Sequence, residues 1–290
     1  MDFVSTHLYP TDPYLPQTRD SFMDAIAIAA AAAGAGGKPL FLTEFNAGLG
    51  PAKLCHNYSL LDSSFAAVFA LHQHLLAQAV PNLQSMSWWT FTDFGFEEQG
   101  ADPHVYWPGH TKFGAMTRTG VPKPIYRGLQ MIAEQAGAPG GSLPLTPQGG
   151  IPVLYKNAEG TVIGAGEGTV DMVVTLAPPG LLVVLAGNFN ASYLELPETA
   201  TVTLQITGLP TPLPTTASLE LLDETHGNPM AAWQAMGSPL YPNASETQAE
   251  MEASLPSMQP LALTPTGASS VSLSFALLPY AMARVSISIS

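Results

Sequence analysis

Side chains capable of chemistry gather at the ends of three apolar, strand-like runs in the first half of the chain. The first run ends in His7 and Tyr9, the second in Glu44, and the third in Trp88-Trp89. In a parallel β/α sheet or barrel the C-terminal strand ends share one side, so these groups are expected to lie together. A carboxylate, aromatic faces and hydrogen-bonding groups suit a sugar, whose ring face stacks on aromatics and whose hydroxyls need polar partners.

Glu44 is the most informative of these residues. It directly follows the apolar run Leu40-Phe41-Leu42-Thr43. A carboxylate at the end of a buried strand costs desolvation free energy unless it is paired or takes part in a reaction. The plainer interpretation is a loop carboxylate that caps a helix or pairs with Lys38 or Lys53. The residues alone leave both interpretations open.

The other candidates are less specific. His7 has the chemistry of a general base or a ligand, although a hydrogen-bonding wall residue is the commoner role. Trp88 and Trp89 are consecutive on a strand and point to opposite faces, which puts one in the core and lets the other face the site. Glu97 and Glu98 form a charge run, for which a solvated loop is the default.

The sequence predicts no metal or cofactor. His72 and His74 lie two apart on an expected helix and point to different faces, so they do not form a metal pair. Cys55 is the single cysteine, with no partner for a disulfide and no thiol-nucleophile signature. The glycine-rich stretch 164–168 has no helix after it and is interpreted as a turn rather than a nucleotide-binding loop.

Strands and helices alternate up to about residue 137. Capping residues, apolar spacing and Gly or Pro positions predict strands at 2–9, 39–44 and 83–91, and helices at 21–33 (with Gly34 after its end), 63–76 and 124–136. This order is typical of a parallel sheet with crossover helices.

The second half is rich in short β-type runs separated by turn residues. Alternation of period two, clearest at 201–206 and 284–289, predicts an antiparallel β-sandwich. For residues 225–265, which are rich in Pro, Met and Ser, the sequence predicts no helix or strand. Residues 138–152 have a Gly- and Pro-rich linker composition. The predicted class is α/β plus all-β, with an α/β domain at 1–137, a linker at 138–152 and a β-sandwich at 153–290.

Composition excludes several functions. Nine Lys and Arg stand against 22 Asp and Glu, giving a formal charge of −13 and arguing against a nucleic-acid partner. No stretch reads as a membrane-spanning helix or a signal peptide. Sequons at Asn57, Asn190 and Asn243 are compatible with secretion but do not establish it. A secreted or lumenal location would need a signal upstream of Met1, and the compartment stays open.

The motifs of the first half resemble glycoside hydrolase family 39, the β-xylosidase and α-L-iduronidase family. Residues 2–12 resemble its sixth barrel strand, and Lys38-Pro39-Leu40-Phe41-Leu42-Thr43-Glu44-Phe45-Asn46 resembles its seventh. Trp88-Trp89-Thr90-Phe91-Thr92-Asp93 with Phe96-Glu97-Glu98-Gln99 looks like the eighth strand and its loop. The resemblance covers residues 2–135, and the xylosidase side fits better.

The resemblance implies a retaining glycosidase that acts on a β-xyloside-like carbohydrate and uses no cofactor. Glu44 would be the nucleophile, His7 and Tyr9 would line the sugar site, and Trp89, Glu97 and Glu98 would be candidates for substrate contacts. The carboxylate would attack the anomeric carbon while a second carboxylic acid protonates the leaving oxygen.

One part of the family pattern is absent. The family's acid/base glutamate lies in an Asn-Glu pair on the fourth strand, and this sequence contains no Asn-Glu dipeptide. The expected fold is therefore the last three β/α units of a (β/α)₈ barrel followed by the sandwich. This predicts a fragment that relies on an N-terminal half or a complementing chain. The alternative is a catalytically dead carbohydrate-binding or interaction protein derived from the family.

Overall fold

The computed structural model describes most of the chain, with gaps around its loops. The described residues are 2–10, 22–48, 60–93, 113–136, 143, 152–156, 162–167, 170–177, 180–190 and 197–289, and for 152–156 and 162–167 only the backbone is described. The predicted linker at 138–152 lies almost wholly outside them.

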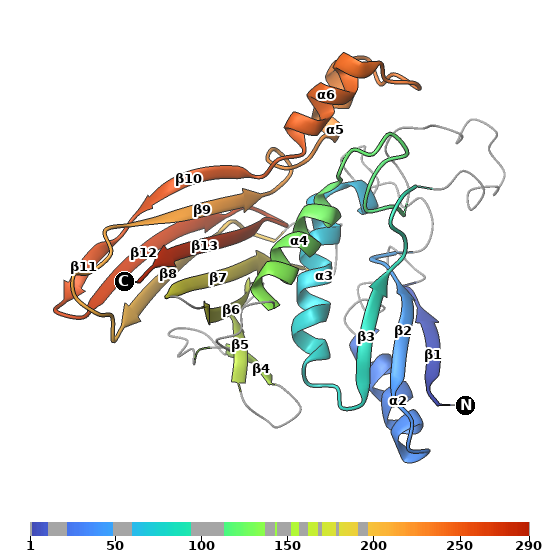
Figure 1. Ribbon diagram of the computed structural model, residues 1–290, viewed down its shortest axis with the longest axis horizontal. Coiled ribbons are helices and arrows are strands. Elements are labelled where there is room, and N and C mark those ends of the chain that lie inside the picture. The colour runs from blue at the N-terminus through green and yellow to red at the C-terminus, as the bar shows by residue number, and fades with distance from the viewer. Residues whose placement is uncertain are drawn as a thin grey trace.

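A three-stranded parallel sheet forms the first part of the fold (Figure 1). Its strands, in the spatial order of the sheet, are β1 (Val4–Leu8), β2 (Leu40–Phe45) and β3 (Leu83–Trp88). The first two helices are α2 (Phe22–Ala35) and α3 (Ser64–Ala77), and a short 3₁₀ turn, η1 (Leu60–Asp62), precedes α3. The predicted alternation of strand and helix is confirmed, although β1 and β3 are shorter than expected and β2 is shifted by one residue.

The end of α2 differs from the prediction. Gly34 was expected just after the helix, but the helix continues to Ala35. The left-handed backbone conformation falls on Gly37, with φ of 69°. Gly34 has a packing role instead, because a Cβ there would lie 3.3 Å from the Asn82 side chain. Asn82 donates to the carbonyls of Ala30 and Lys38, which ties the end of α2 to the start of β3.

Helix α3 begins as predicted but is capped differently. Ser63 has the extended conformation of an N-cap, yet its side chain makes no capping hydrogen bond. Glu224, far along the chain, accepts hydrogen bonds from the backbone nitrogen and hydroxyl of Ser64. The next helix along the chain, α4 (Pro124–Ala136), starts at Pro124 as expected.

The second part of the fold is two antiparallel sheets. The larger has the spatial order β10-β9-β13-β7-β6-β5-β4 and the smaller β11-β12-β8. In chain order the strands are β4 (Pro152–Lys156), β5 (Val162–Glu167), β6 (Val170–Ala177), β7 (Leu181–Asn188), β8 (Ala200–Thr207), β9 (Thr216–Leu222), β10 (Ser257–Ala262), β11 (Thr264–Gly267), β12 (Ser270–Leu277) and β13 (Met282–Ser288). A buried cluster that includes Val184, Leu273, Phe275 and Val285 draws on both sheets, as expected of a sandwich.

Two features of this half were not predicted. The interpretation of 164–168 as a turn is wrong, because Gly164–Glu167 belong to β5 and pair with β4 and β6. Strand pairing across the sheet overrides the weak β propensity of glycine. Between β9 and β10 the chain forms helices α5 (Met230–Ala235) and α6 (Ala244–Ala253), in the stretch for which no element was predicted.

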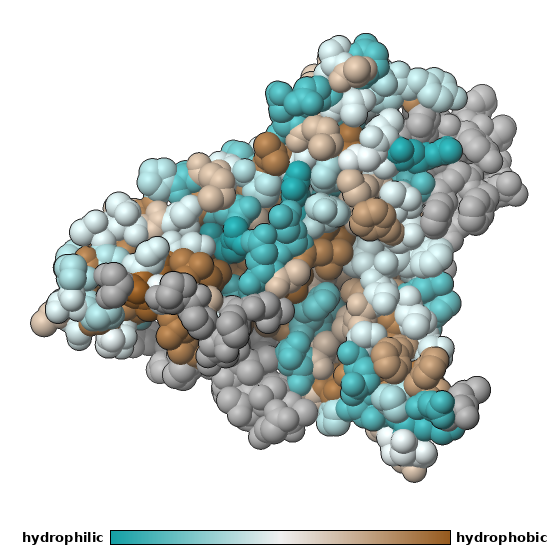
Figure 2. Space-filling model, viewed as in Figure 1, coloured by the Kyte–Doolittle hydropathy of each residue, from teal (hydrophilic) through white to brown (hydrophobic). Residues whose placement is uncertain are grey.

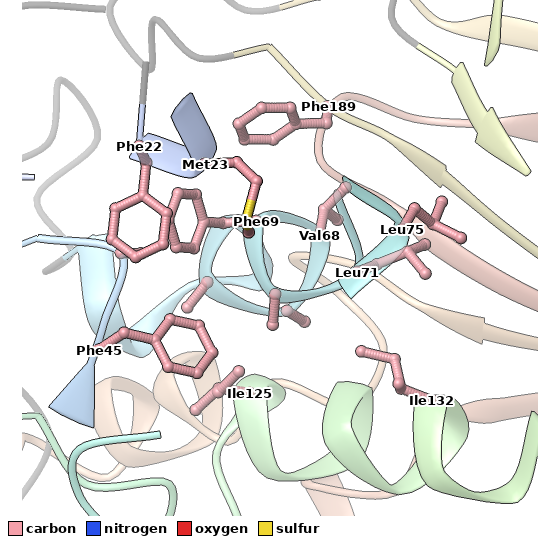
Figure 3. Packing of buried hydrophobic residues seen from close by; sticks show 14 of the residues in the cluster. Phe22, Met23, Phe45, Val68, Phe69, Leu71, Leu75, Ile125, Ile132 and Phe189 are labelled. Carbon is pink, nitrogen blue, oxygen red and sulfur yellow. The ribbon is translucent and has the colours of Figure 1, made fainter. Parts of the chain in front are cut away.

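Helix α3 lies between the two parts and is buried on nearly all sides (Figures 1 and 3). Around it pack Phe22 and Met23 from α2, Phe45 from β2, Ile125 and Ile132 from α4, and Phe189 from the end of β7. A single buried cluster thus contains residues of the parallel sheet, three helices and the larger antiparallel sheet. The two halves share a core rather than touching at their surfaces.

The surface is mixed. On the face shown in Figure 2, apolar residues form small groups separated by polar ones. Within the described part of the chain, no helix has the length and apolarity needed to cross a membrane.

Candidate active site

Glu44 lies near the C-terminal end of β2, beside the end of β1. The Tyr9 hydroxyl donates a 2.8 Å hydrogen bond to Oε2 of Glu44. Nδ1 of His7 lies 3.1 Å from the same oxygen. The strand register makes His7 the direct neighbour of Glu44, after an irregularity between Thr6 and His7. We refer to Glu44, His7 and Tyr9 as the Glu44 cluster.

The Glu44 cluster combines a held carboxylate with solvent access. The side chain of Glu44 is 22% exposed and that of His7 is 53% exposed. Both contacts fall on Oε2, so the carboxylate is oriented through one oxygen while Oε1 is not engaged by either partner. An oriented and partly exposed carboxylate of this kind is suited to attack a bound electrophile.

The two tryptophans at the end of β3 take different positions. Trp88 packs against the main core, edge-on to Phe45 with ring centroids 5.3 Å apart. Trp89 follows the strand, its amide donates to the Phe45 carbonyl at 2.9 Å, and its peptide bond to Thr90 is cis. The carbonyl of Trp89 accepts a short hydrogen bond from the Asn46 side chain. Trp89 is therefore fixed to the segment that carries Glu44.

The carbonyl of Phe113 connects the two strand ends. It accepts hydrogen bonds from the Asn46 amide at 3.2 Å, from the Trp88 indole at 3.3 Å and from the Thr90 backbone nitrogen at 3.1 Å. Asn46 is completely buried. The segment after Glu44 is thus held between the end of β3 and residue 113, which limits where the Glu44 carboxylate can point.

A second, buried set of charges lies behind this edge. Nζ of Lys123 is 2.7 Å from Asp62 Oδ1 and 2.7 Å from Asp93 Oδ1, and all three side chains have no exposed surface. We call Asp62, Asp93 and Lys123 the Lys123 cluster. Asp93 also accepts a 2.8 Å bond from the Gly114 nitrogen. A Cβ on Gly114 would lie 2.3 Å from the Asp93 nitrogen, so this approach requires glycine.

Two carboxylates share one ammonium in this cluster, and burial shifts the pKa of Asp93. Burial raises the pKa of Asp93 above its ordinary value, although the charge of Lys123 opposes the shift. Burial alone would lower the pKa of Lys123, but the neighbouring Asp62 and Asp93 outweigh it and raise that pKa. The lysine therefore stays charged, and Asp93 binds a proton more readily than an exposed aspartate does.

The structure brings together three of the six predicted site residues, namely Glu44, His7 and Tyr9. Trp89 lies at the neighbouring strand end and is linked to them through Asn46. Glu97 and Glu98 lie outside the described residues. The two helical histidines have separate partners, since Nδ1 of His72 is 2.9 Å from Asp171 Oδ2 and Nδ1 of His74 is 2.7 Å from the Ala70 carbonyl.

No group of three or more His, Cys, Asp or Glu suited to hold a metal ion occurs among the described residues. Sequence reasoning missed the Lys123 cluster and the contact between Glu224 and α3. One signal was available for the first of these. Lys123 stands between Pro122 and Pro124 in an otherwise apolar stretch, where a lone charge is expected to be buried and paired.

Comparison with known proteins gives the family. The model of glycosyl hydrolases family 39 matches residues 181–269, which hold β7 through β11 of the sandwich. A curated β-xylosidase of Caldicellulosiruptor saccharolyticus is 25% identical over 297 aligned residues, covering 99% of this chain and 54% of the relative. The family model and this relative both support an assignment to glycoside hydrolase family 39. The resemblance drawn from the motifs of the first half is confirmed.

Solved structures of family 39 share the fold. The family 39 enzyme of Xanthomonas axonopodis pv. citri superposes with a TM-score of 0.65 at 17% identity, covering all of this chain and 55% of that one. A monomeric β-xylosidase of Caulobacter crescentus CB15 gives a TM-score of 0.61 at 18% identity, covering 99% of this chain and 56% of its own. The chain spans about half the length of the relatives it matches.

Proposed function

We propose that this chain carries the nucleophile side of a retaining glycoside hydrolase of the β-xylosidase type, with Glu44 as the nucleophile. The observation that supports it most is the carboxylate of Glu44, held through Oε2 by Tyr9 and His7 at a strand end and still partly exposed. Membership in family 39 and the β-xylosidase relative support a carbohydrate substrate.

In the proposed reaction Glu44 attacks the anomeric carbon of a β-xyloside. The C–O bond to the leaving group breaks as the bond from Glu44 to the sugar forms, giving a glycosyl-enzyme ester that water then hydrolyses. The hydrogen bond from Tyr9 orients the carboxylate and must weaken as Glu44 loses its charge. We assign His7, Trp89, Glu97 and Glu98 to substrate contacts.

The reaction also needs a carboxylic acid about 5–5.5 Å from the nucleophile. Asp62 and Asp93 cannot serve, because both are fully buried against Lys123. The sequence has no Asn-Glu pair of the kind that carries the acid in the family. We propose that the acid is supplied from outside these 290 residues, by an N-terminal half or a complementing chain.

The same proposal gives the domain organisation. Residues 1–137 would be the last three β/α units of a (β/α)₈ barrel, residues 138–152 a connection, and residues 153–290 the sandwich. Three adjacent parallel strands with helices α2, α3 and α4 support this assignment. An unpaired edge of β1 or β3 would then be the place where the other strands join.

The nucleophile can be tested separately from the acid. The probe is a 2-deoxy-2-fluoro-β-xyloside whose leaving group, dinitrophenolate, departs without help from a general acid. Incubation with this probe should add one fluoroxylosyl group to the protein. Peptide mass spectrometry should place that group on Glu44. The Glu44→Gln variant should remain unlabelled. Labelling at another residue would refute the assignment.

The acid is tested by the choice of leaving group. Without a general acid, hydrolysis of alkyl xylosides should be slower by a further factor of about 10²–10⁴ than in a complete family 39 enzyme. Equal rates on both substrates would mean that the acid lies within this chain. Xylose binding in calorimetry with no labelling at all would instead favour the alternative of a catalytically inactive carbohydrate-binding protein.

A further inference from the structure

The β-sandwich contributes a side chain to the framework of the parallel sheet. Glu224 lies just after β9, and its Oε1 accepts hydrogen bonds from the Ser64 backbone nitrogen at 3.0 Å and from the Ser64 hydroxyl at 2.7 Å. A carboxylate at this point satisfies the backbone N–H of Ser64, the first residue of α3, and complements the positive end of the helix dipole. The N-cap residue, Ser63, makes no side-chain capping hydrogen bond itself.

The loop that carries Glu224 is organised in advance. Asp223 Oδ1 accepts from the backbone nitrogens of Thr225 and His226 at 2.8 and 2.9 Å. Asn228 donates to the second oxygen of Glu224 at 3.2 Å and accepts from the Met230 nitrogen at 3.0 Å. Glu224 is therefore presented by a loop whose own polar groups are satisfied, so its position follows that of the sandwich.

From α3 the contacts continue to the strand ends. Asp62 ends the 3₁₀ turn that leads into α3, and it holds Lys123, which in turn holds Asp93. Asp93 binds the Gly114 nitrogen, next to Phe113. The Phe113 carbonyl accepts from Asn46, two residues after Glu44. A series of polar contacts, joined by the backbone between Asp62 and Ser64 and between Phe113 and Gly114, thus runs from the sandwich to the Glu44 segment. We call this series the polar chain.

We propose that Glu224 is a positioning residue for the proposed nucleophile, acting through Ser64, the Lys123 cluster and Asn46. This inference rests on the proposed role of Glu44. The sandwich thereby fixes the first turn of α3, that turn fixes Asp62, and the charge network transmits its position to the segment between Glu44 and Trp89. An error of about 1 Å at a reacting group costs about 10²-fold in rate, so small displacements at the end of the polar chain matter.

The test compares two substitutions at one position. Glu224→Ala removes the acceptor for Ser64, whereas Glu224→Gln keeps a carbonyl acceptor for Ser64 and gives up the negative charge and the bond from Asn228. Amide hydrogen exchange is followed at the start of α3 and at Thr90, Asp93, Ala115 and Met116, whose nitrogens are hydrogen-bonded across the site edge. We expect Ala to speed exchange at both places by at least about tenfold and Gln by much less.

The control breaks a different contact between the sandwich and the helices. Glu134 on α4 pairs with Arg284 on β13 and is 46% exposed. Glu134→Gln weakens that contact without touching the polar chain, and exchange at Thr90 and Asp93 should stay at the wild-type rate. Faster exchange confined to the first turn of α3 in Glu224→Ala would refute the proposal.

A second measurement separates this proposal from the assignment of the nucleophile. The rate constant for covalent labelling by the fluoroxyloside should fall at least about tenfold in Glu224→Ala, with the concentration for half-maximal rate unchanged and Gln restoring most of the loss. If the wild-type protein is not labelled, the proposal that Glu44 is the nucleophile fails. The amide hydrogen exchange experiment then still tests whether Glu224 positions the Glu44 segment. Normal labelling by Glu224→Ala would refute the positioning role.

Discussion

The Glu44 cluster and the Lys123 cluster are both built around carboxylates but differ in almost every physical respect. In the Glu44 cluster a carboxylate at a strand end is held by neutral or weakly basic partners and reaches solvent. In the Lys123 cluster two carboxylates share one ammonium with no exposed surface at all. Only the first can meet a substrate, whereas the second has the burial and the rigid geometry of a structural element.

The difference teaches how one sequence separates reactivity from rigidity. A carboxylate left accessible for attack cannot also be a strong structural contact, because water competes for it. A fully desolvated ion pair is costly to bury but just as costly to break. Hydrogen bonds of Asn46 to the Phe113 carbonyl and of the Gly114 nitrogen to Asp93 connect the two clusters, so that the rigid cluster limits the motion of the accessible one.

The largest expected effect comes from removing the buried cation. Lys123→Met leaves two carboxylates in a site without exposure, and we expect the free energy of unfolding to fall by about 3–5 kcal/mol. Urea unfolding followed by circular dichroism measures it. The triple variant Asp62→Asn, Lys123→Met, Asp93→Asn removes all charges together and should recover a large part of the loss. A loss below about 1 kcal/mol in the single variant would remove the contrast between the clusters.

The matching change in the accessible cluster should cost far less stability. Glu44→Gln keeps the shape and leaves an acceptor for Tyr9, so the free energy of unfolding should change by at most about 1 kcal/mol. Labelling by the fluoroxyloside should disappear in the same variant. A stability loss comparable to that of Lys123→Met would mean that Glu44 is a structural residue.

The next effect tests the packing that carries the buried cluster. Helices α3 and α4 approach closely at Gly128, where a Cβ would lie 2.6 Å from the Cβ of Ala67. Gly128→Ala should therefore lower the free energy of unfolding by about 1–3 kcal/mol despite its better helix propensity. The double variant with Ala67→Gly restores the space and should be more stable than Gly128→Ala alone in thermal unfolding.

A smaller effect is expected from pH at Glu224. Burial raises the pKa of Glu224 above its ordinary value, and hydrogen bonds from Ser64 only partly oppose this. The folded state therefore binds this proton more tightly than the unfolded state does. The resulting stabilisation is present below the unfolded pKa, near 4.3, and is lost as pH rises through the folded value. Glu224→Gln lacks this term, so its stability relative to wild type should increase with pH. A pH-independent difference in urea unfolding would contradict the shift.

A small and local effect should come from a site remote from both clusters. Asn243 caps α6 by accepting from the Ser245 and Glu246 nitrogens, while Glu246 accepts from the Asn243 nitrogen. Asn243→Ala should cost about 1 kcal/mol and speed amide exchange in α6 alone. Faster exchange at Thr90 or Asp93 would show that the two clusters are not separate from the rest of the molecule in the way described.

Much of the fold follows from local patterns. Short apolar runs predicted β1, β2 and β3, Pro124 predicted the start of α4, and period-two alternation predicted β8 and β13. The predictions failed where distant contacts decide the structure. Glycines 164 and 166 lie in β5 because neighbouring strands pair with them. Helix α2 continues past Gly34 to Ala35, and Asn82 contacts this end of the helix.

The site residues also divide into those that local sequence patterns predict and those that distant contacts bring together. His7, Tyr9 and Glu44 were predicted because strand ends meet by geometry, whatever the loops do. The Lys123 cluster brings together a 3₁₀ turn, the segment after β3 and the residue before α4, and no local pattern indicates their meeting. Glu224 is further removed still, since it caps a helix that forms from residues more than half the chain away.

The capping of α3 by Glu224 has a consequence for the order of events during synthesis. A ribosome produces the parallel strands and α3 well before it produces β7, β9 and Glu224. Until then the face of α3 that will contact Phe189 and Leu185 has nothing to cover it, and the nitrogen of Ser64 has no carboxylate to bind. The first half of the nascent chain must therefore wait, partly folded, for the second, and cutting the protein near residue 150 should yield two insoluble pieces rather than two domains.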